Sequence, residues 1–232
     1  DIVRYLISCE LPIEAQNFRN ETALSIAIKY EYYEVAELLL ENGANINTRR
    51  TNGDSPLFAA VFDNRLHTVN FILKHGGEVN LRNDNQETPL MIACRHGYLE
   101  IAQKLLDSGA NVNDIDNGGK TALIQATIAQ KPVIIPILLQ RGALVDLKDC
   151  WGYSALSICC KVKNLKFEII HHLLAAKCDI NSLDRCKNTP LIHACKNQNA
   201  EVAKFLVEQG ADVALQNIDG KAAIDYFPGL LS

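Results

Sequence analysis

Cysteine and histidine are the residue types in this chain that could bind a metal ion or support thiol chemistry. The 232 residues include eight cysteines and six histidines. No two cysteines are spaced as CxxC, which gives a zinc site little support. His171 and His172 are adjacent, but no carboxylate or thiol accompanies them in a pattern typical of a catalytic pair. The residues therefore indicate no metal site, and we expect no cofactor.

Sequence motifs of enzymes are also missing. The chain has no phosphate-binding loop, no GxSxG, no HExxH and no dinucleotide-binding fingerprint. We therefore expect a protein that is not an enzyme, whose function depends on its shape and its surface.

A seven-residue phrase recurs along the chain at a nearly constant interval. It reads ETALSIA from Glu21, then DSPLFAA, ETPLMIA, KTALIQA, YSALSIC and NTPLIHA, and fades into KAAIDYF near the C-terminal end. The second residue of the phrase is small in every copy: Thr22, Ser55, Thr88, Thr121, Ser154, Thr189 and Ala222. Successive copies are 33 residues apart, except for one step of 35 after Ser154. This period is typical of stacked two-helix units.

A second phrase follows the first within each period. It reads NGANIN from Asn42, HGGEVN from His75 and SGANVN from Ser108, with weaker copies further on. Together the two phrases resemble the ankyrin repeat, and the resemblance extends over all 232 residues. It implies an all-α ankyrin-repeat solenoid of helix–turn–helix units with hairpin-like loops. The histidine of the family motif is replaced in each repeat, by Ser25, Phe58, Met91, Ile124, Ser157 and Ile192. We expect Thr or Ser hydroxyls and packing to hold those turns instead.

The resemblance predicts a single ankyrin-repeat domain over residues 1–232. Six full repeats are expected at about 20–52, 53–85, 86–118, 119–151, 152–186 and 187–219. Partial repeats are expected at 1–19 and 220–232, which indicates either a fragment of a longer protein or missing caps. The longer fifth step predicts an insertion between its helices, around residues 161–167.

Each repeat predicts a short inner helix, an outer helix and a turn. The Thr or Ser hydroxyl can cap the inner helix, and a proline in its first turn costs no needed N–H group. The outer helix, as in residues 98–108, carries apolar residues at helical spacing. Pro136 should distort the first turn of the outer helix in the fourth repeat. The left-handed turn that ends the outer helix is expected at Gly43, Gly76, Gly109, Gly142 and Gly210.

The repeat register places most cysteines in the core. Cys94, Cys159, Cys160 and Cys195 occupy positions that face the space between the helices, and Cys178 replaces the alanine of the turn. A free cysteine in such a place behaves as a small buried hydrophobic residue, and unpaired thiols fit a reducing compartment. By contrast, Cys150 and Cys186 are expected in exposed loops. Asparagines at a loop position that some ankyrin repeats hydroxylate are more simply explained as hydrogen-bonding braces: Asn47, Asn80, Asn113 and Asn181.

Two positions in each repeat should line the concave face with which related ankyrin arrays grip other proteins. One lies seven residues after the Thr or Ser, and the other lies six before it. The thirteen residues are Lys29, Phe62, Arg95, Ile128, Lys161, Lys196, Gln16, Arg49, Arg82, Ile115, Lys148, Leu183 and Gln216. Seven of them are basic and none is acidic, which favours a groove that attracts an acidic partner. The alternative is a solvated basic face with no dedicated ligand.

Aromatic residues in the fifth repeat add apolar anchors to this face. Trp151 and Tyr153 are expected on one exposed loop tip beside Lys148, and Trp and Tyr are typical interface anchors. Tyr30 and Phe62 form a smaller pair in the N-terminal repeats. Alternatively, Trp151 folds back on the neighbouring tip and only stabilises it. The predicted partner-binding residues are Tyr30, Arg49, Phe62, Arg82, Arg95, Lys148, Trp151, Tyr153 and Lys161.

Charge and hydropathy narrow the classes of partner. The net charge of −4 opposes a general binder of nucleic acids or anionic membranes. The residue before each Thr or Ser is expected at a loop tip, where the first three repeats carry Glu21, Asp54 and Glu87. No run of 18 apolar residues and no signal-like leader is present, so we expect no membrane insertion. A monomer in the cytoplasm, or in the nucleus, fits these features.

These features leave three functions open. The first is a non-catalytic module that binds an acidic or amphipathic peptide or domain on the concave face. The second is a regulatory or targeting domain of a larger enzyme, channel or ubiquitin ligase. The third, which the acidic loop positions oppose, is binding of a phosphorylated small molecule or an oligonucleotide, with a base stacked on Trp151 or Phe62.

Overall fold

A hydroxyl group begins each inner helix in the computed structural model, which describes residues 4–5, 7, 9, 11–162 and 166–231. The hydroxyl oxygen of the preceding Thr or Ser accepts the backbone N–H three residues further on, at 3.1–3.3 Å. The predicted helix caps are therefore confirmed. The inner helices are α2 (Ala23–Lys29), α4 (Pro56–Phe62), α6 (Pro89–His96), α8 (Ala122–Ile128), α10 (Ala155–Lys161) and α12 (Pro190–Lys196).

An outer helix follows each inner helix and buries one apolar stripe. In α7, for example, the stripe consists of Ile101, Ala102, Leu105 and Leu106. The outer helices are α3 (Tyr33–Glu41), α5 (Leu66–Lys74), α7 (Leu99–Asp107), α9 (Ile135–Gln140), α11 (Phe167–Ala175) and α13 (Ala200–Glu208). The chain continues with α14 (Ala223–Tyr226) and the 3₁₀ turn η2 (Pro228–Leu231).

Left-handed residues end the outer helices, as predicted. The glycines at this position have φ angles of 84–89°. In the fifth repeat Lys177 takes the same place with a φ of 57°, although its side chain disfavours this conformation. The backbone geometry is therefore kept even where the glycine is absent.

The outer helix of the fourth repeat departs from the others because of its prolines. The 3₁₀ turn η1 (Pro132–Ile134) precedes α9, which has six residues where the neighbouring outer helices have nine. Pro136 has no N–H with which to bond the Pro132 carbonyl, and that carbonyl accepts the N–H of Ile135 instead, as in a 3₁₀ turn. The predicted distortion is confirmed and takes the form of a local 3₁₀ turn.

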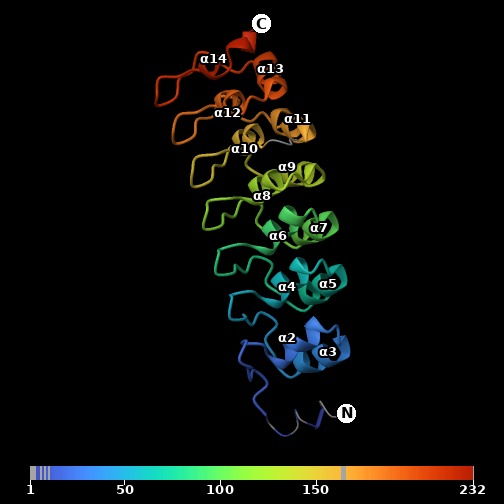
Figure 1. The fold of residues 1–232 in the computed structure, drawn as a ribbon. Coiled ribbons are helices and arrows are strands. Elements are labelled where there is room, and N and C mark those ends of the chain that lie inside the picture. The colour runs from blue at the N-terminus through green and yellow to red at the C-terminus, as the bar shows by residue number, and fades with distance from the viewer. Residues whose placement is uncertain (1–3, 6, 8, 10, 163–165, 232) are drawn as a thin grey trace. The chain divides into compact units, whose positions relative to one another are not determined.

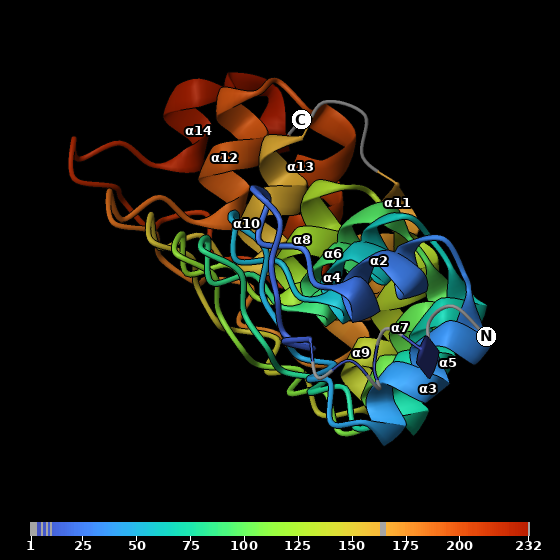
Figure 2. The same cartoon turned by 90° about the horizontal axis from the view of Figure 1, so that it is seen from below.

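The helices group into two compact units. The first comprises the described residues of Asp1–Ala93 and Tyr98–Asn111, and the second those of Cys94–Gly97 and Val112–Ser232. In the first unit α2 packs against α3 and α4, α4 against α5, and α5 against α7. In the second unit α8 packs against α9 and α10, and α12 packs against α10, α13 and α14. Within each unit the inner helices lie between the loops and the outer helices (Figure 1), and the loops gather on one side (Figure 2).

The predicted all-α solenoid is confirmed. Among the described residues the only extended pairing is an isolated bridge between Gln16 and Thr22. The repeat boundaries remain a prediction. Part of the N-terminal partial repeat (1–3, 6, 8 and 10) and the centre of the expected insertion (163–165) lie outside the described residues.

Buried side chains fill the positions that the repeat register assigns to the core. The six residues in the histidine slot are at most 5% exposed. Ser25 Oγ additionally donates to the Thr22 carbonyl at 3.0 Å. Hydroxyls and packing therefore hold these turns, as expected.

Asparagine side chains tie neighbouring repeats together. Asn80 Oδ1 accepts the N–H of Asn111 at 2.9 Å, and its amide donates to the Gly109 carbonyl at 3.1 Å. Asn47 and Asn113 make the same pair of bonds one repeat away on either side. The interpretation of these asparagines as braces is confirmed.

Candidate partner-binding site

The loop between α9 and α10 holds Trp151 on the surface. One carboxylate oxygen of the nearly buried Asp149 accepts the N–H groups of Trp151 and Tyr153, both at 2.9 Å. The Trp151 carbonyl accepts the N–H of Arg185 from the next loop at 3.3 Å. These bonds fix the backbone, while the indole is 63% exposed. The alternative in which Trp151 folds back and is buried on the neighbouring tip is not observed.

A surface hollow lies beside this loop in the second unit. It is lined by Ile128 from the end of α8, by Asp149, Trp151 and Tyr153 from the loop, and by Ile158, Lys161 and Val162 from the α10 segment. Most of the lining is apolar, and Ile128 is 42% exposed although it is a large hydrophobic residue. We call this place the Trp151 hollow. It brings together three of the predicted partner-binding residues: Trp151, Tyr153 and Lys161.

A stack of polar and aromatic groups supports the floor of the Trp151 hollow. Lys161 Nζ lies 3.4 Å from the centroid of the Tyr153 ring, a close cation–π contact. The Tyr153 ring meets the buried His193 ring edge-on at 5.4 Å. His193 Nε2 in turn lies 2.9 Å from Asp184 Oδ2. This chain of contacts orients Tyr153 and keeps a positive charge at the rim of an apolar surface.

The surroundings of His193 and Asp184 determine which of the two side chains is charged. Burial lowers the pKa of His193, and the nearby Asp184 opposes that shift only in part. Burial also raises the pKa of Asp184, but hydrogen bonds from Asn188 and His193 outweigh it and hold the pKa below its ordinary value. A neutral imidazole beside an ionised carboxylate is the arrangement that these shifts favour at neutral pH.

Two further predicted residues of the second unit are engaged within the protein. Lys148 is exposed, and its Nζ donates to the Leu183 carbonyl at 2.9 Å. Arg95 is half-buried, and its Nε donates to Gln125 Oε1 at 3.2 Å. Gln125 Nε2 then donates to Asp116 Oδ2 at 2.8 Å. Neither cation is simply solvated, so each has a structural role beside any role in binding.

The remaining predicted residues belong to the first unit. Tyr30 is 59% exposed and its ring stacks on that of Tyr32 at 6.3 Å. Phe62 is 54% exposed, Arg49 is exposed and Arg82 is half-buried. None of these four lines the Trp151 hollow.

The expectation that the residue before each Thr or Ser lies at an exposed loop tip is wrong. Glu21 is 8% exposed and Asn188 is 5% exposed. The position lies where the hairpin-like loop closes: the Glu21 carbonyl accepts the N–H of Asn17, and the Asn188 carbonyl accepts the N–H of Asp184. Backbone pairing across the loop therefore draws this residue inward, and the tip is two or three residues earlier.

Sequence reasoning missed one residue that breaks a repeated pattern. Five positions before the Thr or Ser, the loops carry a residue whose side-chain oxygen accepts the N–H groups two and four residues on: Asn17, Asn83, Asp116, Asp149, Asp184 and Asn217. The loop that precedes Ser55 has Arg50 in that place, which cannot accept a hydrogen bond. The sequence shows that Arg50 replaces an Asn or Asp, but the contacts of Arg50 are known only from the structure.

The core cysteines are placed as the register predicted, but Cys150 does not have the exposed position that was expected for it. Burial raises the pKa of the thiols of Cys94, Cys159 and Cys160 far above the ordinary value, and that of Cys195 to about 11. Such thiols stay protonated and unreactive at neutral pH. Cys186 is exposed and Cys150 is half-buried. Within the described part of the chain, no three His, Cys, Asp or Glu side chains gather as metal ligands would.

None of the helices described has the length and hydrophobicity needed to cross a lipid bilayer.

Comparison with known proteins gives consistent matches. A family model described as ankyrin repeats (3 copies) matches residues 47–116. A second, described as ankyrin repeats (many copies), matches residues 6–57 and 173–227. Together they cover well over half of the chain.

Three curated proteins are similar over part of their length. A Rickettsia bellii protein described as an ankyrin repeat protein is 37% identical over 95 residues, which are 39% of this chain and 56% of that protein. A Danio rerio protein described as the palmitoyltransferase ZDHHC13 is 32% identical over 101 residues, 43% of this chain and 16% of that protein. Danio rerio ankyrin repeat and SOCS box protein 11 is 33% identical over 91 residues, 39% of this chain and 30% of that protein. The chain thus spans about half of the first relative and less of the other two.

Proposed function

Because the chain belongs to the ankyrin-repeat family, a family of protein-interaction modules, we propose that it is a non-catalytic recognition module that binds a partner protein at the Trp151 hollow. The observation that carries this proposal is a rigidly held loop with a largely exposed indole beside an apolar hollow. Exposed large aromatic groups next to apolar pockets are typical of interface hot spots.

The partner should combine an apolar side chain with a neighbouring carboxylate. The apolar group would occupy the surface between Trp151 and Ile128, which water now covers at a cost in free energy. The carboxylate would pair with Lys161, whose ammonium lies at the rim of the hollow over Tyr153. An amphipathic, acidic peptide segment has this chemistry. We expect a monomer that acts in the cytoplasm or the nucleus.

Paired alanine substitutions test the proposal. The variant with Trp151→Ala and Tyr153→Ala should lose its partner, with an affinity lowered by about thirtyfold or more if Trp151 contributes about 2 kcal/mol. Proteins captured from cell extract by the unsubstituted chain and by the variant can be compared by quantitative mass spectrometry. A captured candidate is then titrated in purified form by calorimetry against every form of the chain, and against the fluorescence of Trp151, the only tryptophan in the chain, for the forms that retain it.

Leu144→Ala is the matched control. Leu144 is 57% exposed and does not line the Trp151 hollow. This variant should bind the candidate with unchanged affinity. A partner that binds all three forms equally, or one whose binding leaves the Trp151 emission unchanged, would contradict the proposal.

A second candidate function is that of an interaction domain within a longer enzyme or ubiquitin-ligase component. Two relatives that are much longer than the matching segment favour it, since their names describe a palmitoyltransferase and a SOCS box protein. The mass of the endogenous protein, measured with an antibody against this chain, tests it. A product whose mass matches this chain alone, about 25.7 kDa, would contradict this second candidate.

Oligonucleotide binding is a weaker alternative that the same fluorescence assay addresses. Quenching of Trp151 by short single-stranded oligonucleotides, with strong dependence on salt, would favour it.

A further inference from the structure

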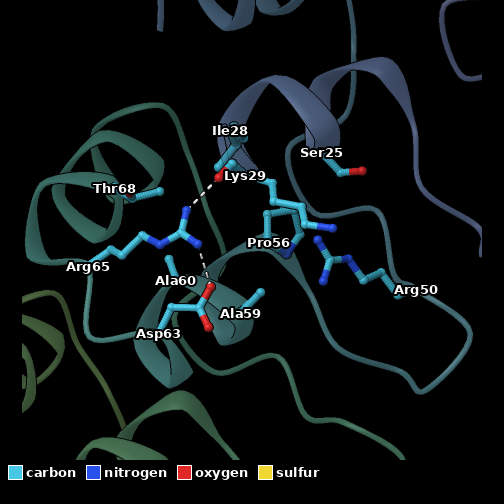
Figure 3. A pocket seen from close by; sticks show the side chains of 10 residues that line it. All are labelled: Ser25, Ile28, Lys29, Arg50, Pro56, Ala59, Ala60, Asp63, Arg65 and Thr68. Atoms are coloured by element: carbon cyan, nitrogen blue, oxygen red, sulfur yellow. Dashed lines mark hydrogen bonds and ion pairs between the residues drawn. The ribbon is translucent and has the colours of Figure 1, made fainter. Parts of the chain in front are cut away.

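A small cavity in the first unit is surrounded by three cations. It is lined by Lys29 at the end of α2, Arg50 in the loop between α3 and α4, and Arg65 before α5, together with Pro56 and Asp63 (Figure 3). We call it the Arg50 cavity. Its volume is about 40 Å³. It shares no residue with the Trp151 hollow.

One of the three cations, Arg65, is bound to groups of the protein itself. The Arg65 guanidinium donates to the Lys29 carbonyl and pairs with Asp63 at 2.7 Å, and both interactions are visible in Figure 3. Arg65 therefore forms a fixed wall of the cavity. Its charge is balanced by Asp63.

The other two cations compete for one carboxylate. Lys29 Nζ and Arg50 Nη2 each lie 3.5 Å from the same oxygen, Glu21 Oε1. The other oxygen of Glu21 accepts a hydrogen bond from Asn17 at 3.1 Å. That bond and the two cations lower the pKa of Glu21, although burial opposes the shift. Glu21 is thus ionised at neutral pH and is shared between two cations, and Asp54 also interacts electrostatically with Arg50.

Arg50 also holds a buried donor without a partner. Its Nε has no hydrogen-bond acceptor and is closed to solvent. A buried donor left in this state costs free energy. Arg50 stands where the other loops carry a bracing Asn or Asp, so its own loop also forgoes that brace. Two local costs at one residue are typical of a functional site.

From these observations we infer that the Arg50 cavity is a binding site for a single carboxylate group, such as an Asp or Glu side chain of a peptide. The carboxylate pairs with Lys29 Nζ and with the outer nitrogens of the Arg50 guanidinium, which otherwise share the single Glu21 oxygen. Planar, bidentate pairing with carboxylates is the interaction that arginine makes best.

The cavity is small, about 40 Å³, so it has room for a compact anionic group such as a carboxylate. The inference does not depend on the Trp151 hollow, and its test does not require a partner protein.

Titration of the whole chain with small anions tests the site. We expect saturable shifts of the Arg50 Nε–H resonance and of the backbone amides of Lys29 and Asp63 on addition of sodium acetate. Sodium chloride and inorganic phosphate at the same ionic strength should give only weak, linear shifts. A blocked peptide with one glutamate should bind more tightly than acetate if the natural source is a side chain, and equally if it is a free carboxylate.

Three variants make the test specific. Arg50→Asn restores the residue type found in the other loops, so it should fold, and it should weaken acetate binding by about tenfold. Glu21→Gln removes the internal competitor and should strengthen binding. Arg19→Gln, an exposed position in the same unit, should change nothing.

Two results would overturn the assignment. One is an acetate response at Lys29 and Asp63 that is equal in the unsubstituted chain and in Arg50→Asn. The other is a tighter response to phosphate than to acetate, because that would replace the carboxylate with a different ligand class. Loss of partner binding in the Trp151 variant leaves the acetate test unaffected, so the two proposals can fail separately.

Discussion

At the scale of single residues, the buried pair of His193 and Asp184 should make the stability of the protein depend on pH. His193 contacts Tyr153, which lines the Trp151 hollow. His193 is 7% exposed, and Lys161 and Lys196 add positive potential near it. Because its folded-state pKa lies below the ordinary value of 6.5, protonation favours the unfolded chain. The stability that the neutral imidazole contributes is complete above that ordinary value and is lost as the pH falls through the folded pKa.

The free energy of unfolding should therefore fall between about pH 7.5 and about pH 5. Urea unfolding at several pH values measures this dependence. The variant His193→Asn should show a shallower slope over the same window, and His67→Asn, at an exposed position of α5, should retain the original slope. Equal slopes in all three proteins would rule out His193 as the titrating group. Asp184 acts at lower pH, since its pKa is below the ordinary 3.8.

The core cysteines illustrate a residue type whose chemistry is suppressed by its position. Their thiols are buried, and burial raises their pKa values. They contribute apolar volume between the helices and no reactivity.

At the scale of the elements, the turns after the outer helices decide where each helix ends. Five of the six repeats have a glycine at this position, and the fifth repeat has Lys177 with a φ of 57°. A side chain in the left-handed region costs about 1–2 kcal/mol. Glycine would remove this cost. It would also give the unfolded chain more conformational freedom, which lowers the free energy of unfolding by about 0.4–1 kcal/mol.

Lys177→Gly should therefore stabilise the protein by roughly 0.5–1 kcal/mol. The midpoint of urea unfolding, monitored by circular dichroism, measures the change. Gly142→Ala is the converse control: no atom lies within 4 Å of an added Cβ there, so its expected destabilisation isolates the cost of the backbone conformation. A Lys177→Gly protein less stable than the original would show that the lysine stem makes compensating contacts.

At the scale of the whole molecule, each helix pair depends on its neighbours and not on one central core. The packing partners of α4 are α2 and α5, and those of α12 are α10, α13 and α14. In such an array the stability is approximately a sum of repeat terms and nearest-neighbour terms. Damage to one repeat should therefore remain local.

Matched core substitutions in the two units test this locality. Ile72 in α5 and Ile170 in α11 are both fully buried, and Ile→Val at either site should cost about 0.5–1.5 kcal/mol. Hydrogen exchange followed by mass spectrometry should show faster exchange in α2–α5 for Ile72→Val, with α12 and α13 unchanged. The Ile170→Val protein should show the opposite distribution. Uniformly faster exchange in either variant would mean that the described chain opens as one cooperative unit.

Much of the fold follows from local sequence, because the signals that define it act over a few residues. A hydroxyl at Thr88 caps α6 through the N–H of Met91, three residues away. Gly109 ends α7 by its own backbone conformation. Apolar spacing within nine residues sets the buried face of an outer helix. The regular repeat then places each element, and so the all-α solenoid could be derived without coordinates.

The site could be predicted only in part. The sequence identified Trp151, Tyr153 and Lys161, because aromatic and basic residues at loop and helix-end positions stand out against the repeat. It assigned Arg95 and Lys148 to partner binding alone, whereas they also donate to Gln125 and to the Leu183 carbonyl. Both acceptors are about one repeat away in sequence, and the choice between such an acceptor and water depends on rotamers that no periodicity encodes.

By itself, therefore, the sequence determined the helices, their caps and turns, the buried faces and the membership of the repeat family. Only the tertiary structure decided that Tyr153 is supported by Lys161 and His193, and that Lys29 and Arg50 converge on one Glu21 oxygen. The physical reason is range. Backbone conformation is governed by neighbours a few residues away, whereas the charge balance of a cavity depends on side chains that are distant in the sequence and meet only in the folded chain.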